Sequence, residues 1–255
     1  MGFMDKFKAE SAGRRPYGLH VQANRLYDQG KTAEARAKHD QAIKLYDEAV
    51  KAGCNKASYL MAYGVLLLRY GRFDESKALF LKAEHAPGIT KQEKHQLRIN
   101  FAIAQWKLGD LDSAISQMKI AMNEGVNGLI YGSLGYVLIE KARQTGDFTE
   151  AVEFNNKAME YDDEDAVVLD NMGQLNLAMG DKEKAKEFFT KAHEIKPKQV
   201  DTLYYLAKLS AEAGDKDKAV EYLDTALNGN YSALCTTTRQ QALDLKAGIT
   251  GKKEE

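Results

Sequence analysis

A 34-residue pattern occurs twice in succession in the C-terminal half of the chain, and no other feature constrains the fold as strongly. Residues 166–199 and residues 200–233 each contain two stretches of helical hydrophobic periodicity that meet at a Gly-Asp pair. Self-similarity at this period is typical of helical repeat arrays, because one helix pair cannot bury its hydrophobic face without neighbours. The sequence therefore predicts a repeat array in place of a single globular core.

The residue types within residues 166–199 follow the requirements of two antiparallel helices. Small residues are expected where the two helices cross closely, namely at Gly173, Ala185 and Ala192. Phe189 is expected to fill the layer between the helices. Gly180 suits the left-handed conformation that ends a helix, and the Asp181 side chain suits the cap of the next helix. Pro197 cannot continue the second helix and therefore ends it.

This order of alanine, aromatic, alanine and a closing proline resembles the tetratricopeptide repeat. The resemblance covers residues 16–233 and implies an all-α, right-handed superhelical solenoid of about six antiparallel helix pairs. The expected repeats are residues 16–56, 57–94, 95–127, 128–165, 166–199 and 200–233. Residues 234–250 are expected to form a capping helix that shields the last hydrophobic face. Residues 251–255 are expected to form a charged tail.

Three departures from the regular period predict local differences among the repeats. The second helix of the first repeat is expected to continue to about Ala52, where Gly53 stops it. Residues 89–94 are expected to form a short connector. In the fourth repeat the turn at Gly146 comes four residues late, which predicts one additional helical turn at about residues 141–145.

The segment before the array, residues 1–15, contains one short amphipathic stretch. Phe3, Met4 and Phe7 fall on one helical face. Three interpretations stay open: an unordered terminus, a weak membrane-surface anchor, or a segment that docks into the groove of its own array.

The sequence argues against several classes of protein. No apolar run is long enough to cross a membrane, and none follows the N-terminus as a secretion signal would. Cys54 and Cys235 have no metal-ligand spacing, which favours two reduced thiols. We therefore expect a cytoplasmic protein.

The charges are unevenly divided along the chain. Residues 1–127 contain 20 Lys and Arg against 14 Asp and Glu, whereas residues 128–255 contain 16 against 23. The basic residues are neither clustered nor interleaved with stacking aromatic residues, so nucleic acid is not an expected partner.

Few residues indicate catalysis. The five histidines are scattered along the chain without HExxH spacing, and no phosphate-binding loop follows a strand pattern. The acidic run at residues 162–165 lacks the alternate-position ligand spacing of a calcium loop. We expect no enzymatic activity, no cofactor and no bound metal.

The resemblance also implies where a partner binds. In tetratricopeptide repeat proteins the first helices of successive repeats line a concave groove, and their second, fifth, sixth, ninth, twelfth and thirteenth positions tend to face it. The candidate groove residues at these positions are Met61, Val65, Ile99, Asn100, Ile103, Trp106, Tyr136, Asn171, Gln174, Tyr204 and Lys208. Asp170 and Tyr205 occupy matching positions beside them. Trp106 is the strongest candidate, because tryptophan is enriched at binding hot spots.

The expected groove is apolar in its middle and polar at its ends, which favours a hydrophobic peptide or an amphipathic helix as its ligand. The sequence thus predicts a non-enzymatic protein–protein interaction scaffold. The alternative is a membrane-surface adaptor anchored by the N-terminal amphipathic stretch. The identity of the partner and the oligomeric state stay open.

Overall fold

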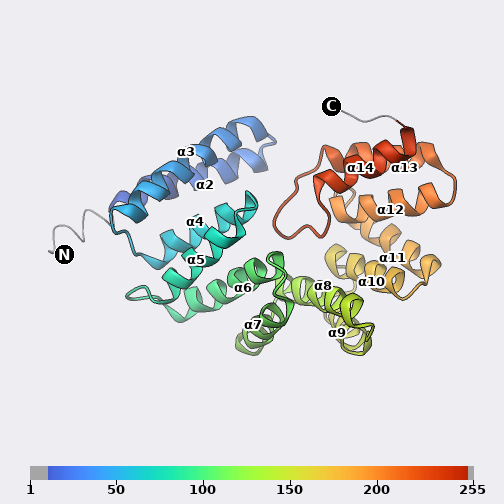
Figure 1. The fold of residues 1–255 in the computed structure, drawn as a ribbon, viewed down its shortest axis with the longest axis horizontal. Coiled ribbons are helices and arrows are strands. Elements are labelled where there is room, and N and C mark those ends of the chain that lie inside the picture. Colours follow the sequence, from blue (N-terminus) through green and yellow to red (C-terminus); the bar gives the residue numbers. More distant parts are fainter. Residues whose placement is uncertain (1–10, 252–255) are drawn as a thin grey trace. The chain divides into compact units, whose positions relative to one another are not determined.

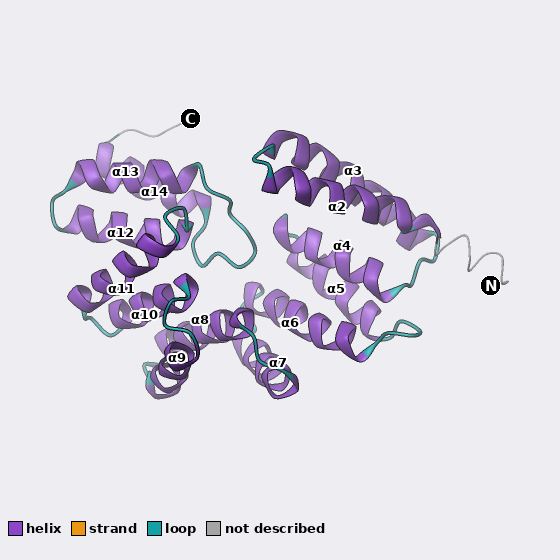
Figure 2. Cartoon of the chain, turned by 180° about the vertical axis from the view of Figure 1, so that it is seen from behind, coloured by secondary structure: helices purple, strands orange, loops and turns teal. Residues whose placement is uncertain are grey.

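The computed structural model describes residues 11–251, and within that range every regular element is a helix (Figure 2). Phe3, Met4 and Phe7 and the tail from residue 252 onward lie outside the described residues. The interpretations of the N-terminal segment therefore stay predictions.

Twelve of the described helices form six consecutive pairs. The first helices of these pairs are α2 (Arg14–Asp28), α4 (Ala57–Arg69), α6 (Lys91–Lys107), α8 (Gly128–Thr145), α10 (Ala166–Ala178) and α12 (Val200–Glu212). The second helices are α3 (Thr32–Lys51), α5 (Phe73–Glu84), α7 (Leu111–Glu124), α9 (Thr149–Tyr161), α11 (Lys182–Ile195) and α13 (Lys216–Leu227). A last helix, α14 (Arg239–Thr250), follows the sixth pair.

The helices fall into two compact units (Figure 1). Unit 1 is Met1–Glu124 and contains α2 to α7, and unit 2 is Gly125–Glu255 and contains α8 to α14. The two helices of each pair pack against one another, and α14 packs against α13. First helices also contact each other, α2 with α4 and α4 with α6 in unit 1, and α8 with α10 in unit 2. The all-α array of helix pairs that the sequence predicts is confirmed.

In two of the pairs, a glycine on the first helix lies close to a phenylalanine ring on the second. A Cβ atom at Gly64 would lie 2.5 Å from Phe80 Cε1, and one at Gly173 would lie 2.6 Å from Phe189 Cδ1. Both phenylalanines are completely buried. The ring therefore occupies the space that any larger residue on the first helix would need.

At the equivalent two positions of three other repeats, a larger residue on the first helix accompanies a smaller one on the second. Alanine on the first helix accompanies a residue other than phenylalanine on the second, in the pairs Ala23 and His39, Ala102 and Met118, and Ala207 and Leu223. The fourth repeat combines Gly135 with Asn155, and a Cβ at Gly135 would lie 2.5 Å from Asn155 Oδ1. Outside the fourth repeat, the chain thus keeps a similar summed volume at the crossing by pairing glycine with phenylalanine and alanine with a smaller side chain.

Glycine in the left-handed conformation separates the helices of each pair. Gly180, between α10 and α11, has a φ of 91°. This backbone conformation is strained for residues other than glycine. The equivalent turns have positive φ at Gly30, Gly71, Gly109, Gly146 and Gly214. The late turn at Gly146 follows a first helix of 18 residues, against 13 in α10, so the predicted additional helical turn is confirmed.

The start of α6 differs from the expected boundary. The helix begins at Lys91, inside the stretch expected to be a connector, and not near residue 95. Thr90 and Glu93 form a capping box, in which the Thr90 hydroxyl oxygen accepts from the Glu93 amide and the Glu93 carboxylate accepts from the Thr90 amide. This arrangement satisfies two amides at the start of a helix, which explains the earlier start.

The start of α14 also differs from the expected boundary. The helix begins at Arg239 and not at residue 234, because Thr238 and Gln241 form a second capping box. Residues 228–238 therefore form a long loop between α13 and α14. Ala242 is completely buried against α12 and α13, which is the shielding contact expected of a last helix.

The packing at the helix crossing gives a test by double-mutant cycle. We expect Gly173→Ala to cost about 1 to 3 kcal/mol of unfolding free energy, because the new methyl group overpacks against Phe189. In the Phe189→Leu background the same change is expected to cost at least about 0.5 kcal/mol less, since Ala with Leu is the combination found at Ala207 and Leu223. Urea unfolding of the natural chain, the two single variants and the double variant measures the cost of Gly173→Ala in both backgrounds. Equal costs in the two backgrounds would contradict the proposed contact.

Candidate functional site

Most of the predicted groove residues of unit 1 are apolar and buried. Met61, Ile103 and Trp106 are buried, and Val65 is half-buried. Ile99 is 1% exposed and belongs to the core of the unit. Most of these predicted positions therefore contribute more to packing than to an open surface.

Two polar side chains of α6, Lys107 and Asn100, lie at or next to the predicted groove positions. Lys107 Nζ lies 3.9 Å from the centre of the Trp106 ring, a cation–π contact. Asn100 is buried and its Oδ1 accepts a long hydrogen bond, of 3.5 Å, from Gln96 Nε2. The surface near Trp106 is thus apolar with a positive charge over the ring.

A second cluster in unit 1 contains two buried histidines among aromatic rings. The His20 and His39 ring centres are 5.2 Å apart, and the Tyr27 and Tyr70 rings lie 5.5 and 6.4 Å from His39. Burial, the neighbouring His39 and the Arg69 charge lower the pKa of His20 to about 4. Burial and Arg69 lower the pKa of His39 to about 4 as well. Both rings are therefore neutral at pH 7.

In unit 2 the predicted residues divide into buried and accessible ones. Asn171 Nδ2 donates to the Gly132 carbonyl oxygen at 2.8 Å and so joins α10 to α8. Tyr136 is buried, and burial raises the pKa of its hydroxyl. Tyr204 and Lys208 are half-buried on α12. Of these four residues, the two on α12 remain within reach of a partner.

The loop at residues 228–238, called the covering loop below, lies on the first helices of unit 2. Gln174 Nε2 on α10 donates to Thr236 Oγ1 at 3.1 Å. The Thr236 and Thr237 amides donate to Asp201 Oδ1 on α12 at 3.0 and 2.7 Å, and the Thr237 hydroxyl donates to the same oxygen at 2.6 Å. A segment of the chain itself therefore contacts residues of both helices at positions that the repeat pattern predicts to face a groove.

Two carboxylates, Asp170 and Asp201, are buried beside the covering loop. Thr202 Oγ1 and Gln174 Nε2 each donate to Asp170 at 2.7 Å. Burial and the nearby Asp201 carboxylate raise the pKa of Asp170 to about 7, and burial raises the pKa of Asp201. All the hydrogen bonds described above for the two acids come from neutral groups.

Two amide oxygens near Asp170 are buried and have no hydrogen-bond partner within residues 11–251: Gln174 Oε1 and Gln199 Oε1. Gln174 directs its amino group at Asp170, while Gln199 Nε2 donates to Thr202 Oγ1 at 3.1 Å. Arg143 on α8 reaches only the Gln174 carbonyl, at 3.4 Å. The site therefore contains more hydrogen-bond acceptors than donors.

Asp201 is the residue of this site that the sequence analysis missed. It is the second residue of α12, and the second position is one of the six expected to face the groove. The positional rule therefore contained the signal. The covering loop lies in a stretch without hydrophobic periodicity, so its place on α10 and α12 had no signal in the sequence.

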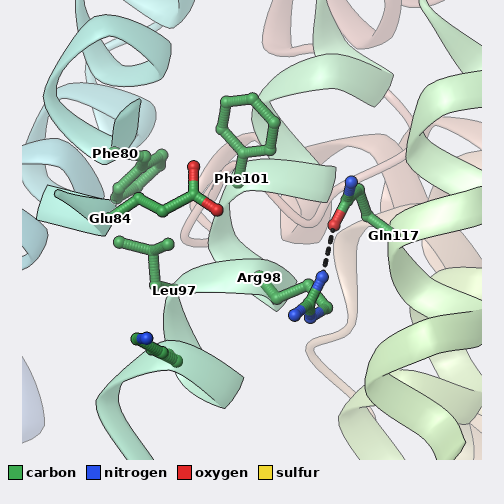
Figure 3. A pocket seen from close by; sticks show the side chains of 7 residues that line it. Phe80, Glu84, Leu97, Arg98, Phe101 and Gln117 are labelled. Atoms are coloured by element: carbon green, nitrogen blue, oxygen red, sulfur yellow. Dashed lines mark hydrogen bonds between the residues drawn. The ribbon is translucent and has the colours of Figure 1, made fainter. Parts of the chain in front are cut away.

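A small cavity in unit 1 is lined by residues of α5, α6 and α7 (Figure 3). It has a volume of about 200 Å³, and its lining residues are Phe80, Glu84, Lys94, Leu97, Arg98, Phe101 and Gln117. Arg98 Nη1 donates to Gln117 Oε1 at 3.0 Å across its edge. One acid and two bases line the cavity, so its charges favour no class of ligand.

Residues 11–251 contain no group of three or more His, Cys, Asp or Glu side chains placed to hold a metal ion. The same part of the chain has no helix that is both long and apolar enough to span a membrane.

Comparisons with known proteins agree with the repeat pattern. One tetratricopeptide repeat model matches residues 176–233, and a second matches residues 21–88. The structure resembles that of a thermophilic tetratricopeptide repeat protein from Thermus thermophilus, with a TM-score of 0.61 at 20% identity over 76% of this chain and 97% of that chain. The chain contains tetratricopeptide repeats. Tetratricopeptide repeats are typical of non-enzymatic scaffolds for protein–protein interaction.

Other solved structures share the tetratricopeptide repeat fold. A chain of the APC/C hetero-tetramer Cut9–Hcn1 gives a TM-score of 0.59 at 14% identity, over 95% of this chain and 47% of that chain. A tetratricopeptide repeat protein from Parabacteroides merdae ATCC 43184 gives 0.54 at 14% identity, over 92% and 86% of the two chains. No curated protein matches the sequence. At these identities the likeness concerns the fold.

The two histidines of unit 1 predict a loss of stability in acid. In the unfolded chain both rings take up a proton near pH 6.5, whereas in the folded repeat they resist protonation to about pH 4. The unfolded state therefore binds more protons, and the opening free energy of α2 and α3 is expected to fall by a few kcal/mol between these pH values. Hydrogen exchange of the α2 and α3 amides measures this fall.

The variant His39→Leu is the matched control. It places Leu opposite Ala23, as in the sixth repeat, and is expected to retain stability at pH 7 while reducing the acid-dependent fall. An equally steep fall in this variant would show that other groups cause the acid sensitivity.

Proposed function

We propose that this tetratricopeptide repeat protein is a non-enzymatic interaction module that binds a segment of a partner protein on the first-helix faces of its repeats. The observation that carries the proposal is the covering loop of unit 2. A loop of the chain lies on α10 and α12 and is held by Gln174 and Asp201, through both backbone amides and hydroxyl groups. A face that binds one irregular protein segment has the chemistry to bind another.

The predicted groove residues of unit 1 favour apolar contacts with a ligand, in addition to the hydrogen bonds that unit 2 offers. Trp106 and Ile103 are almost fully buried, and Val65 is half-buried. A ligand side chain that reaches Val65, Ile103 or Trp106 meets apolar side chains, and the Lys107 ammonium lies over the tryptophan ring. The ligand proposed for unit 1 is therefore a hydrophobic peptide or the apolar face of an amphipathic helix.

Site-specific photo-crosslinking tests the proposed faces. A benzophenone amino acid at Val65 or at Lys208 replaces a half-buried side chain on a first helix. The matched controls are Leu81 and Ile195, which are 43% and 50% exposed on second helices. We expect crosslinks to one specific protein in the native lysate from the first-helix positions, at yields about tenfold above the controls, because contact energy concentrates in small central patches. Equal crosslinking from both sets would place the binding surface elsewhere.

A further inference from the structure

We infer that the first-helix face of unit 2 is a recognition site for a lysine or arginine side chain of a partner peptide, which binds between Asp170 and Asp201 when the covering loop moves aside. The inference rests on the proposed function, because it names the chemistry of a ligand for the same face. It also gives the covering loop a role, that of an internal occupant which the peptide replaces.

The first argument is the excess of acceptors. Asp170 and Asp201 bring two buried carboxylates, and the buried Gln174 Oε1 and Gln199 Oε1 have no donor within the described residues. A guanidinium group offers five N–H donors and an ammonium group three, and neither has an acceptor. A basic side chain therefore supplies what this site lacks, and an acidic or neutral one does not.

The second argument is the absence of a positive partner for the two acids. The ion pairs of unit 2 among residues 11–251 involve other acids, and Arg143, the nearest base described above, binds the Gln174 carbonyl. Unit 2 also has 16 Lys and Arg against 23 Asp and Glu, so its net charge attracts basic ligands. A buried carboxylate without a positive partner is costly, and a basic side chain would offset that cost.

The third argument concerns the covering loop. Residues 228–238 contain no lysine or arginine, so the loop offers Asp201 only amide and hydroxyl donors. Leu234 in the loop is exposed and does not anchor it in the core. The hydrogen bonds described above between the loop and α10 or α12 all involve Thr236 or Thr237. A charged donor makes stronger hydrogen bonds to a carboxylate than these neutral groups do.

The test uses the full chain and a positional-scanning library of fluorescein-labelled short peptides, with binding measured by fluorescence anisotropy. The best arginine-containing peptide is then compared with the same peptide carrying citrulline, which preserves the shape of the side chain without its charge. We expect citrulline to weaken binding about tenfold or more, because charge-assisted hydrogen bonds are about twice as strong as neutral ones. Equal affinities would overturn the inference, while crosslinks from Lys208 would still support the proposed function.

Replacement of residues 229–237 by a Gly-Ser segment of equal length tests the role of the loop. This change removes the Thr236 and Thr237 side chains and keeps the connection to α14 intact. We expect the arginine peptide to bind about tenfold more tightly, because the face no longer has to be vacated first. Unchanged or weaker binding would overturn the inference that the loop competes with the peptide.

The acids are tested by the double variant Asp170→Asn, Asp201→Asn. We expect about tenfold or greater loss of affinity for the arginine peptide, since its charged partners are gone. The control Asp163→Asn, Glu164→Gln changes the net charge equally at exposed positions and is expected to bind within about twofold of the natural chain. Equal losses in the two variants would reduce the effect to net charge and overturn the inference.

Thermal unfolding separates a binding role of the acids from a structural one. We expect Asp170→Asn to leave the midpoint unchanged or to raise it, because the new amide removes a buried charge and can donate to Gln174 Oε1. A lower midpoint would assign Asp170 a structural role and overturn the inference. A rise of the midpoint with calcium or magnesium ions alone, absent in the double asparagine variant, would also overturn it, because a metal ion would then be the occupant.

Discussion

The close crossing of the two helices within each pair is the contact on which the structure depends. At Gly64 and Gly173 the first helix comes so near the second that a Cβ atom would enter the ring of Phe80 or Phe189. Where the first helix carries alanine, the second carries a side chain other than phenylalanine, as at Ala207 and Leu223. Five of the six repeats therefore keep a similar summed volume at the crossing with different residues, whereas the fourth combines Gly135 with the smaller Asn155.

The sequence predicts those parts of the fold that follow from this local exchange of sizes. The helix pairs, the glycine turns and the longer α8 all carry signals within a few residues of their place. The starts of α6 and α14 differ from the predicted boundaries because a capping box outweighs the position expected from the period. The position of a residue within its first helix predicts whether it faces a groove, but it does not predict how exposed the side chain is. Ile99 thus lies in the core although its position matches that of half-buried residues. Burial depends on neighbouring repeats, which a position within one helix does not describe.

Two repeats place a polar residue in the layer that phenylalanine fills elsewhere, His39 in the first and Asn155 in the fourth. Each has a buried atom without a hydrogen-bond partner among the described residues, His39 Nε2 and Asn155 Oδ1. The two side chains make different contacts at the helix crossing. Asn155 Nδ2 donates to the Gly135 carbonyl oxygen at 3.2 Å, whereas the His39 ring makes an edge contact with His20 and a tilted contact with Tyr27. The same position thus tolerates polar groups only where a nearby backbone oxygen or ring receives them.

Burial of titratable groups is expected to make the stability of the two units depend on pH in opposite directions. In unit 1 burial lowers the pKa of His20 and His39 to about 4, so their contribution to stability is lost as pH falls below about 6.5. In unit 2 burial and the Asp201 charge raise the pKa of Asp170 to about 7, so its contribution is present in acid and is lost as pH rises through that value. At neutral pH unit 2 therefore retains an unfavourable pair of acids that no base of unit 2 pairs with among the described residues. Neutral donors of the covering loop lower this cost for Asp201, whereas Asp170 receives hydrogen bonds from Thr202, Gln174 and Gln199. A positively charged occupant of this face would favour the ionised pair that burial alone disfavours.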